Sequence, residues 1–220
     1  MRIDILSLFP GYFESPFGFS ILKRAKEKGL LDLHLIDIRD FAEGRHKKVD
    51  DRPYGGGSGM VLMPGPVCRA IRSVRKEDSV VIYMTPQGEP LSAKKCEQLS
   101  SKKHLILLCG HYEGIDERAL LKEKVEEISI GDYVLTNGCI AAIVLVDAVA
   151  RFIPGVLGKE EAAQEDSFQE GLLEGPVYTR PEEFEGLEVP LVLRRGNHQE
   201  IKKWRKGEAR KKTARVRRDL

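Results

Sequence analysis

Three glycine-rich loops, each at the end of an apolar run, constrain the fold of this chain more than any other feature. They are Tyr83–Gly88, Cys109–Gly114 and Ile130–Gly138. Ligands of open α/β sheets bind in the crevice outside the carboxyl ends of the strands, which is where loops that follow buried strands lie. The loops therefore predict a pocket of backbone amides and carbonyls, better suited to a flat, polar cofactor than to a metal ion or a phosphate.

Short apolar runs alternate with helical patterns along the first 150 residues. Buried strands are predicted at four runs, Arg2–Phe9, Val80–Met84, Leu105–Cys109 and Ile128–Leu135, and Leu31–Leu35 alternates as a half-buried strand does. Helices are predicted over two of the intervening segments, Ile21–Lys28 and Ser92–Leu99. This alternation predicts an α/β fold with a mainly parallel sheet and helices on both faces.

The segment Cys139–Ile153 is apolar almost all round until Pro154 stops it. A helix of this kind must be buried, either in the core or against a second subunit. The acidic stretch Gly158–Gly175 predicts a linker, and a short basic helical region begins near Gly196. We therefore divide the chain into a domain at 1–157, a flexible linker at 158–175 and a basic, mostly helical domain at 176–220.

The net charge of +2 hides a segregation of charge along the chain. Residues 201–220 hold ten basic and two acidic side chains, a net charge of +8, which leaves −6 for the first 200 residues. This asymmetry predicts a polyanionic partner, with nucleic acid as the leading candidate, and a solvated basic tail is almost as good an interpretation.

Composition indicates a cytoplasmic protein without a membrane partner. The four cysteines form no C-x-x-C pair, which indicates reduced thiols, and no histidine or cysteine spacing resembles a metal site. No stretch approaches the roughly 20 apolar residues that span a bilayer, and the first residues do not resemble a signal peptide.

Three further sites contain residue types suited to chemistry. In the segment Asp50–Gly59, Arg52 and Tyr54 are suited to holding a phosphate or stacking on a base, but the segment matches no nucleotide fingerprint and a flexible turn is slightly favoured. Arg151, after the apolar helix, either caps its carbonyls or stabilises negative charge on a substrate. Asp166 in the linker becomes a general base only if the linker folds over the pocket.

Eight motifs, in order along nearly the whole chain, resemble those of the bacterial tRNA (guanine-N1)-methyltransferase family. They are DDRPYGGGSGM, YMTPQG, CGHYEGIDER, SIGDYVLTNG, RFIPGVLG, EDSF, YTRPEEFEGLEVPLVL and GNHQEIKKWR. The resemblance implies a deep C-terminal trefoil knot, S-adenosylmethionine held by the three loops, and a homodimer with each active site at the subunit interface. The implied reaction is methyl transfer to N1 of the guanosine at position 37 of tRNA, next to the anticodon.

The resemblance also implies roles for single residues. Asp166, supplied by the partner subunit, matches the proposed general base, and Arg151 matches its electrostatic partner. Together with the charge pattern, the motifs predict tRNA contacts at Arg52, Tyr54, Lys202, Lys203 and Arg205. Contacts with S-adenosylmethionine are expected at Tyr83, Met84, Thr85, Pro86, Gly88, Gly110, Glu113, Gly114, Ile130, Gly131, Asp132, Tyr133, Val134, Leu135 and Gly138.

Two departures from the family pattern and three alternatives accompany this interpretation. Cys139 stands where the family usually has an acidic residue, and the chain ends at Leu220 where the family's helical domain generally continues, so we expect a shortened tRNA anchor.

The alternatives are a knotted methyltransferase for another RNA position, a non-catalytic RNA-binding module, and a Rossmann-type enzyme, which the missing glycine fingerprint disfavours. Assistance by a divalent cation such as Mg²⁺ stays open.

Overall fold

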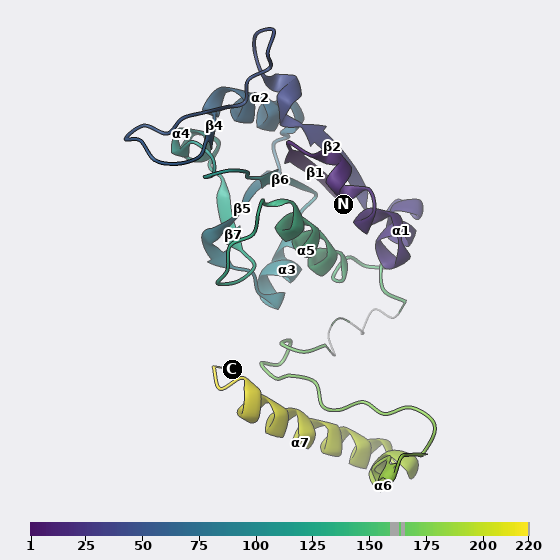
Figure 1. The fold of residues 1–220 in the computed structure, drawn as a ribbon. Helices are drawn as coiled ribbons and strands as arrows, with labels where there is room; N and C mark the ends of the chain where they lie inside the picture. The colour runs from purple at the N-terminus through teal and green to yellow at the C-terminus, as the bar shows by residue number, and fades with distance from the viewer. Residues whose placement is uncertain (159–162, 164–165, 220) are drawn as a thin grey trace. The chain divides into compact units, whose positions relative to one another are not determined.

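The computed structural model describes residues 1–158, 163 and 166–219. The chain divides into two compact units, Met1–Lys159 and Glu160–Leu220 (Figure 1). Across the described residues, no helix is long and apolar enough to cross a membrane.

The first unit is built on a parallel sheet of five strands. These are β1 (Arg2–Ser7), β2 (Asp32–Asp37), β5 (Ser79–Pro90), β6 (His104–Cys109) and β7 (Glu126–Ser129). They lie in the order β2-β1-β6-β5-β7, and every neighbouring pair is parallel. The predicted α/β fold with a mainly parallel sheet is therefore confirmed.

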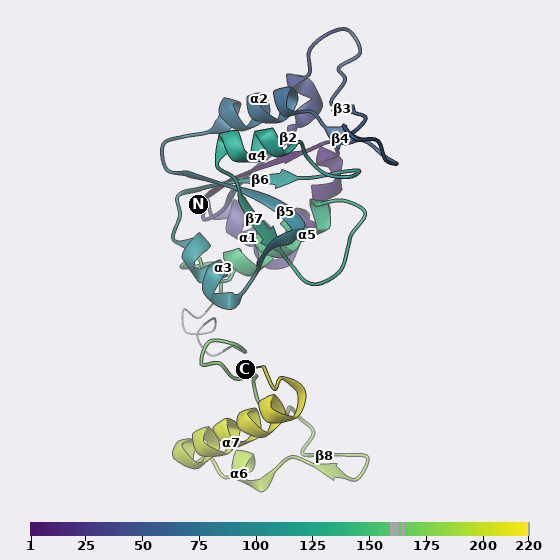
Figure 2. The same ribbon diagram turned by 90° about the vertical axis from the view of Figure 1, so that its left-hand side faces the viewer.

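Helices cover both faces of this sheet, as Figure 2 shows. One apolar cluster packs the sheet against α1 (Ser20–Glu27), α3 (Ala93–Ser100) and α5 (Cys139–Ala150). A second cluster on the other face includes α2 (Pro64–Val74) and α4 (Glu117–Glu123). The remaining short elements of this unit are η1 (Pro10–Phe13), η2 (Pro16–Gly18), η3 (Ile38–Phe41), β3 (Asp50–Asp51) and β4 (Val61–Leu62).

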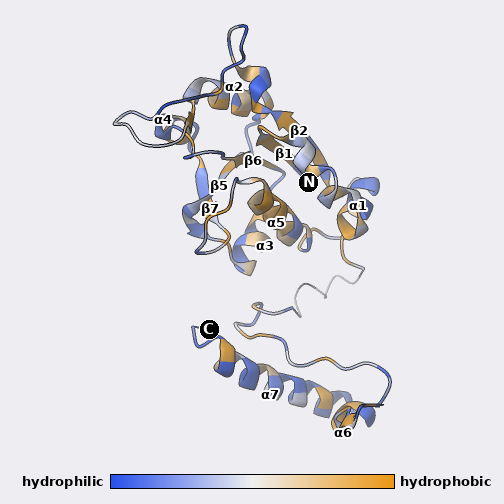
Figure 3. Cartoon of the chain, viewed as in Figure 1, coloured by the Kyte–Doolittle hydropathy of each residue, from blue (hydrophilic) through white to orange (hydrophobic). Residues whose placement is uncertain are grey.

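The central strands are apolar on both sides because both of their faces are covered. All six residues of β6 are buried, and so are five of the six in β1. Parallel sheets with two covered faces have such continuous apolar runs. The edge strand β2 is mostly exposed or half-buried, so the predicted half-buried alternation holds only loosely there. Figure 3 shows α5 as one of the most hydrophobic segments.

The strand predicted at Ile128–Leu135 is wrong beyond Ser129. β7 ends at Ser129, and the chain then turns because Gly131 has a φ of +149° and accepts a hydrogen bond from the Tyr133 amide at 2.9 Å. Ile128 of β7 pairs with both Met84 and Glu89 of the neighbouring strand β5. The β5 residues between Met84 and Glu89 therefore bulge out of the sheet. The chain thus leaves the sheet at both places to form loops.

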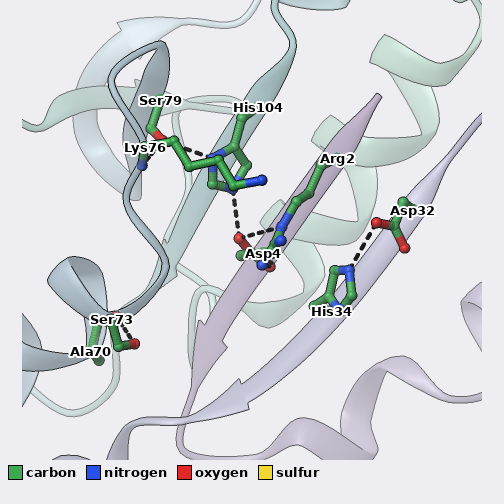
Figure 4. A network of polar contacts seen from close by, with 9 residues as sticks. All are labelled: Arg2, Asp4, Asp32, His34, Ala70, Ser73, Lys76, Ser79 and His104. Atoms are coloured by element: carbon green, nitrogen blue, oxygen red, sulfur yellow. Dashed lines mark hydrogen bonds and ion pairs between the residues drawn. The ribbon is translucent and has the colours of Figure 1, made fainter.

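A buried polar network joins β1, β5 and β6 at their amino ends (Figure 4). Asp4 is fully buried and lies 2.5 Å from His104 Nε2, and His104 Nδ1 lies 2.7 Å from Ser79 Oγ. Ser79 Oγ also accepts a hydrogen bond from the Lys76 amide. Arg2 completes the network by donating to Asp4. This chain of bonds satisfies a carboxylate that would otherwise be costly to bury.

The second unit consists of a small hairpin, β8 (Glu183–Phe184) and β9 (Leu187–Glu188), and two helices, α6 (Leu191–Arg194) and α7 (His198–Val216). Asn197 caps α7, because its side chain accepts hydrogen bonds from the backbone amides of Gln199 and Glu200. The Leu173 amide donates to Thr213 Oγ1 at 2.9 Å and ties the preceding segment to α7. Of the linker predicted at 158–175, residues 159–162 and 164–165 lie outside the described residues.

Candidate functional site

A cavity of about 230 Å³ lies at the carboxyl ends of β5, β6 and β7. Its walls come from the three glycine-rich loops, with Ala141 from the first turn of α5. Parallel strands place their carboxyl ends at one edge of the sheet, so loops that are distant in sequence meet there. The loops are long enough to form a cavity because β5 bulges and β7 ends early.

The cavity brings together thirteen of the fifteen residues predicted to hold the cofactor. They are Tyr83, Met84, Thr85, Pro86, Gly110, Glu113, Gly114, Ile130, Gly131, Tyr133, Val134, Leu135 and Gly138. Gly88 and Asp132 are not among the lining residues. The lining residues absent from the prediction are Gln87, His111, Tyr112, Ile128, Ser129, Thr136, Asn137 and Ala141. All of these except Ala141 belong to the three loops or to the end of β7, just before the third loop. The sequence signal for these residues was therefore the complete loop and not single motif positions.

Close backbone contacts explain several of the glycines. The Gly138 amide donates to the Gly110 carbonyl at 2.9 Å, and a Cβ atom added at Gly138 would lie 3.1 Å from the Cα atom of Cys109. A Cβ atom at Gly88 would lie 2.4 Å from the carbonyl carbon of Glu127. Gly88 therefore allows two backbone segments to pass each other, and this packing accounts for its absence from the cavity wall.

The electrostatics of the cavity favour a ligand with positive charge. Among the described lining residues, Glu113 is the single acidic side chain, and no lysine or arginine accompanies it. Tyr83 contributes a ring and a hydroxyl, and burial raises the pKa of this tyrosine so that it stays neutral at physiological pH. The other walls are backbone amides, carbonyls and apolar side chains, which suit a flat ring system.

Cys139 belongs to a small buried group of polar side chains beside the cavity. Its thiol is buried and lies 3.3 Å from Ser7 Oγ, and its amide donates to the Asn137 side chain at 2.8 Å. A hydrogen bond with Cys109 lowers the pKa of Cys139 to about 7, whereas the same bond and burial raise the pKa of Cys109. The residue that departs from the family pattern thus belongs to a buried network at the start of α5.

Backbone hydrogen bonds connect the glycine-rich segment that carries Arg52 and Tyr54 to the second cavity loop, Cys109–Gly114. The Glu113 amide donates to the Met60 carbonyl at 3.0 Å, and the Leu62 amide donates to the Gly114 carbonyl at 2.9 Å. The tip of the segment is open to solvent, since Tyr54 is 98% exposed. The two predicted RNA contacts therefore stand on a projecting loop whose base borders the cavity.

The predicted catalytic residues belong to different units. Arg151 directly follows α5 in the first unit, where it is exposed. Asp166 belongs to the second unit, where it is half-buried and lines another cavity, of about 640 Å³, with Lys202 and Arg205 of α7. Lys203, the third predicted RNA contact on α7, lines a separate hollow of about 500 Å³. In the described parts of both units, no three histidine, cysteine or acidic side chains gather closely enough to hold a metal ion.

Comparison with known proteins gives a consistent result along the whole chain. The family described as tRNA (guanine-1)-methyltransferase TrmD matches residues 1–220. A tRNA (guanine-N(1)-)-methyltransferase of Protochlamydia amoebophila is 66% identical over 220 residues, which is all of this chain and 99% of that protein. Proteins of the same name from Chlamydia pneumoniae and Chlamydia muridarum are 62% and 61% identical over the whole chain, which spans 61% and 62% of their lengths.

Proposed function

This chain belongs to the tRNA (guanine-1)-methyltransferase family, and from that premise we propose that it transfers a methyl group from S-adenosylmethionine to N1 of a guanosine in tRNA. The proposed guanosine is that at position 37, next to the anticodon. The observation that carries the proposal is the convergence of the three family motifs at one cavity with a single carboxylate. A tRNA substrate would place the protein in the cytoplasm.

The cavity fits S-adenosylmethionine in its chemistry. This cofactor, when bound, supplies an electrophilic methyl group on a positively charged sulfur. Glu113 gives the cavity a negative charge to balance the ligand, while Ile128, Leu135 and Ala141 offer apolar surface to an adenine ring. Gly110 leaves room for the Tyr83 ring, since a Cβ atom there would lie 2.8 Å from that ring.

The chain's own residues supply the acid–base chemistry on the substrate side. Guanine N1 carries a proton and is a poor nucleophile, so the Asp166 carboxylate accepts this proton as N1 takes up the methyl group. Negative charge that develops on guanine O6 is stabilised by the Arg151 guanidinium. General base catalysis of this kind contributes roughly 10²–10⁴-fold to the rate. Asp166 reaches the site from the partner subunit, so the active enzyme is a homodimer.

The proposal includes a trefoil knot through which the chain threads around the cofactor loops. Two close backbone passages support it, one at Gly88 against Glu127 and one at Gly138 against Cys109. Gly88 requires glycine because a Cβ atom there would collide with backbone, and Gly138 allows a tight backbone contact that a Cβ atom would crowd. Such tight crossings are expected where a chain passes through its own loop.

The two units take separate tasks in this proposal. Residues 1–157 form the methyltransferase domain, 158–175 link it to the second domain, and 176–220 bind tRNA. Three cations of α7, Lys202, Lys203 and Arg205, lie on a helix whose surface is rich in positive charge. Lysine and arginine at such positions neutralise phosphates of the RNA backbone.

The test is a methylation assay with labelled S-adenosylmethionine and tRNA transcripts that carry guanosine or adenosine at position 37. We expect methyl transfer only to the guanosine transcript, with the label on N1 after digestion. Asp166→Asn should lower kcat/KM by roughly 10²–10⁴-fold while cofactor binding persists. Glu174→Gln is the matched control, because it lines the same cavity as Asp166 and glutamine can still accept the bond from Ser167 Oγ.

Three outcomes would contradict the proposal. Label at another nucleotide would indicate a knotted methyltransferase with a different target. Binding of tRNA without any methylation would indicate a non-catalytic RNA-binding module. An Asp166→Asn variant as active as the Glu174→Gln control would remove Asp166 from the role of general base.

A further inference from the structure

Gly59 leaves the space in which the Glu113 side chain lies. A Cβ atom added at position 59 would lie 2.5 Å from Glu113 Oε1 and 2.6 Å from Glu113 Cγ. Non-bonded carbon and oxygen atoms do not approach this closely, so any side chain at position 59 would occupy the place of the glutamate. The three atoms nearest to such a Cβ atom all belong to the Glu113 side chain.

The backbone around this contact is fixed. Met60, next to Gly59, accepts the Glu113 amide at 3.0 Å, and the Leu62 amide donates to the Gly114 carbonyl at 2.9 Å. Leu62 is fully buried and pairs with Ile115 as an isolated parallel bridge. These bonds hold the two segments at a set separation, so a collision at position 59 would be relieved by movement of the glutamate.

The glutamate can move at little cost to folding. Glu113 is exposed, and its side chain has several rotatable bonds. A residue larger than glycine at position 59 would therefore turn the carboxylate away, in addition to the backbone strain that a φ of +91° imposes on any other residue there. The effect should appear in the cavity, because Glu113 is the single acidic side chain among the described residues that line it.

We propose that Gly59 is a positioning residue of the cofactor pocket, which holds the Glu113 carboxylate toward the cationic S-adenosylmethionine by having no side chain of its own. This inference rests on the proposed function, since it takes that cofactor as the ligand. It makes the glycine-rich segment, which carries the predicted RNA contacts Arg52 and Tyr54, a part of the cofactor site as well.

The experiment measures binding of S-adenosylmethionine to the full chain by isothermal titration calorimetry. Gly59→Ala should weaken binding by about fivefold, the effect expected when one partly exposed ionic contact is lost. Gly57→Ala is the matched control. Its φ of +120° is also positive, so alanine strains the backbone there too, but the nearest atom to its Cβ would be Pro53 Cγ at 4.0 Å. Its affinity should remain close to that of the wild type.

A double-mutant cycle separates positioning from general damage. Glu113→Ala alone should weaken binding about as much as Gly59→Ala, and adding Gly59→Ala to Glu113→Ala should cost nothing more. Thermal unfolding of each variant shows whether the fold is retained. Wild-type affinity in Gly59→Ala, equal losses in Gly59→Ala and Gly57→Ala, or additive losses in the double variant would each overturn the inference. Absence of binding by the wild type would instead overturn the proposed function.

Discussion

Glu123 shows what a single buried charge requires of its neighbours. This carboxylate at the end of α4 is 3% exposed and accepts hydrogen bonds from Arg72 and Arg75, each with a 2.6 Å contact. The two arginines lie on α2 and just after it, so the three side chains join the two helices on one face of the sheet. A buried carboxylate is tolerated only with such paired and hydrogen-bonded partners.

We predict that Glu123→Gln lowers the free energy of unfolding by about 1–2 kcal/mol. Breaking a buried ion pair typically costs about 3–5 kcal/mol, but Arg72 and Arg75 are partly exposed and water compensates part of the loss. The control is Glu27→Gln in the exposed pair with Lys23, which should change stability by less than about 0.5 kcal/mol. Urea unfolding measures the free energy of unfolding of both variants. An equal decrease in the two variants would contradict the prediction.

At the level of single residues, the sequence predicted most of the cavity because its motifs are contiguous loops. Asp132, a predicted cofactor contact beside the turn at Gly131, is exposed and is not among the residues that line the cavity. Gly88, another predicted contact, also lies outside the cavity wall and passes close to the backbone of Glu127. A motif shows that a residue type is needed and leaves open whether a ligand or another part of the chain needs it.

Among the helices, α4 depends on a charged cap at its start. Asp116 precedes α4 and its carboxylate accepts hydrogen bonds from the amide and the guanidinium of Arg118. The side-chain bond with Arg118 holds the pKa of Asp116 below its usual 3.8 in the folded chain. A folded pKa below the unfolded one means that the charged carboxylate stabilises the fold above about pH 4, and that this contribution disappears as pH falls through the folded pKa.

We predict that Asp116→Ala lowers the free energy of unfolding by about 1 kcal/mol near pH 7, the usual cost of losing a helix cap. The difference from wild type should shrink as pH falls below about 4, because the wild-type carboxylate then loses its charge. Ser92→Ala removes the uncharged cap of α3, which accepts the Lys95 amide at 3.2 Å, and its cost should not follow this titration. Urea unfolding over a pH series tests both; a constant difference for Asp116→Ala would contradict the prediction.

Whole elements were predictable where apolar periodicity was continuous. The strands β1 and β6 and the helix α5 lie close to their predicted places because buried strands and helices have unbroken apolar runs. β7 was predicted too long, since Val134 and Leu135 continue the apolar run but lie in a loop that forms the cavity. The helices α2 and α4 received no prediction from the sequence. An apolar run indicates that its residues are sheltered from water. Whether they lie in a sheet or line a pocket depends on the tertiary arrangement.

For the molecule as a whole, the apolar helix α5 bears on assembly. Its inner residues are buried, but Ile140 and Val144 are each 41% exposed within the chain. Two β-branched residues four positions apart lie on one face of a helix. The proposed homodimer gives this face a partner, in agreement with the expectation that an all-round apolar helix is buried in the core or against a second subunit.

We predict that Val144→Glu converts the proposed dimer to a monomer, because a carboxylate buried in an apolar interface without a partner is strongly unfavourable. Leu121→Glu is the control, since Leu121 on α4 is 69% exposed and lies outside the α5 face. Sedimentation equilibrium over a range of concentrations distinguishes the two. A Val144→Glu protein that stays dimeric would show that another surface holds the subunits together.

The same variant separates cofactor binding from catalysis. The described residues around the cavity at the carboxyl ends of β5, β6 and β7 all belong to the first unit, so we expect a Val144→Glu monomer still to bind S-adenosylmethionine, and this binding also reports that the domain is folded. Methyl transfer should fall by roughly 10²–10⁴-fold, because the proposed base Asp166 comes from the partner subunit. A monomer that binds the cofactor and transfers methyl groups at the wild-type rate would show that a single chain completes the site.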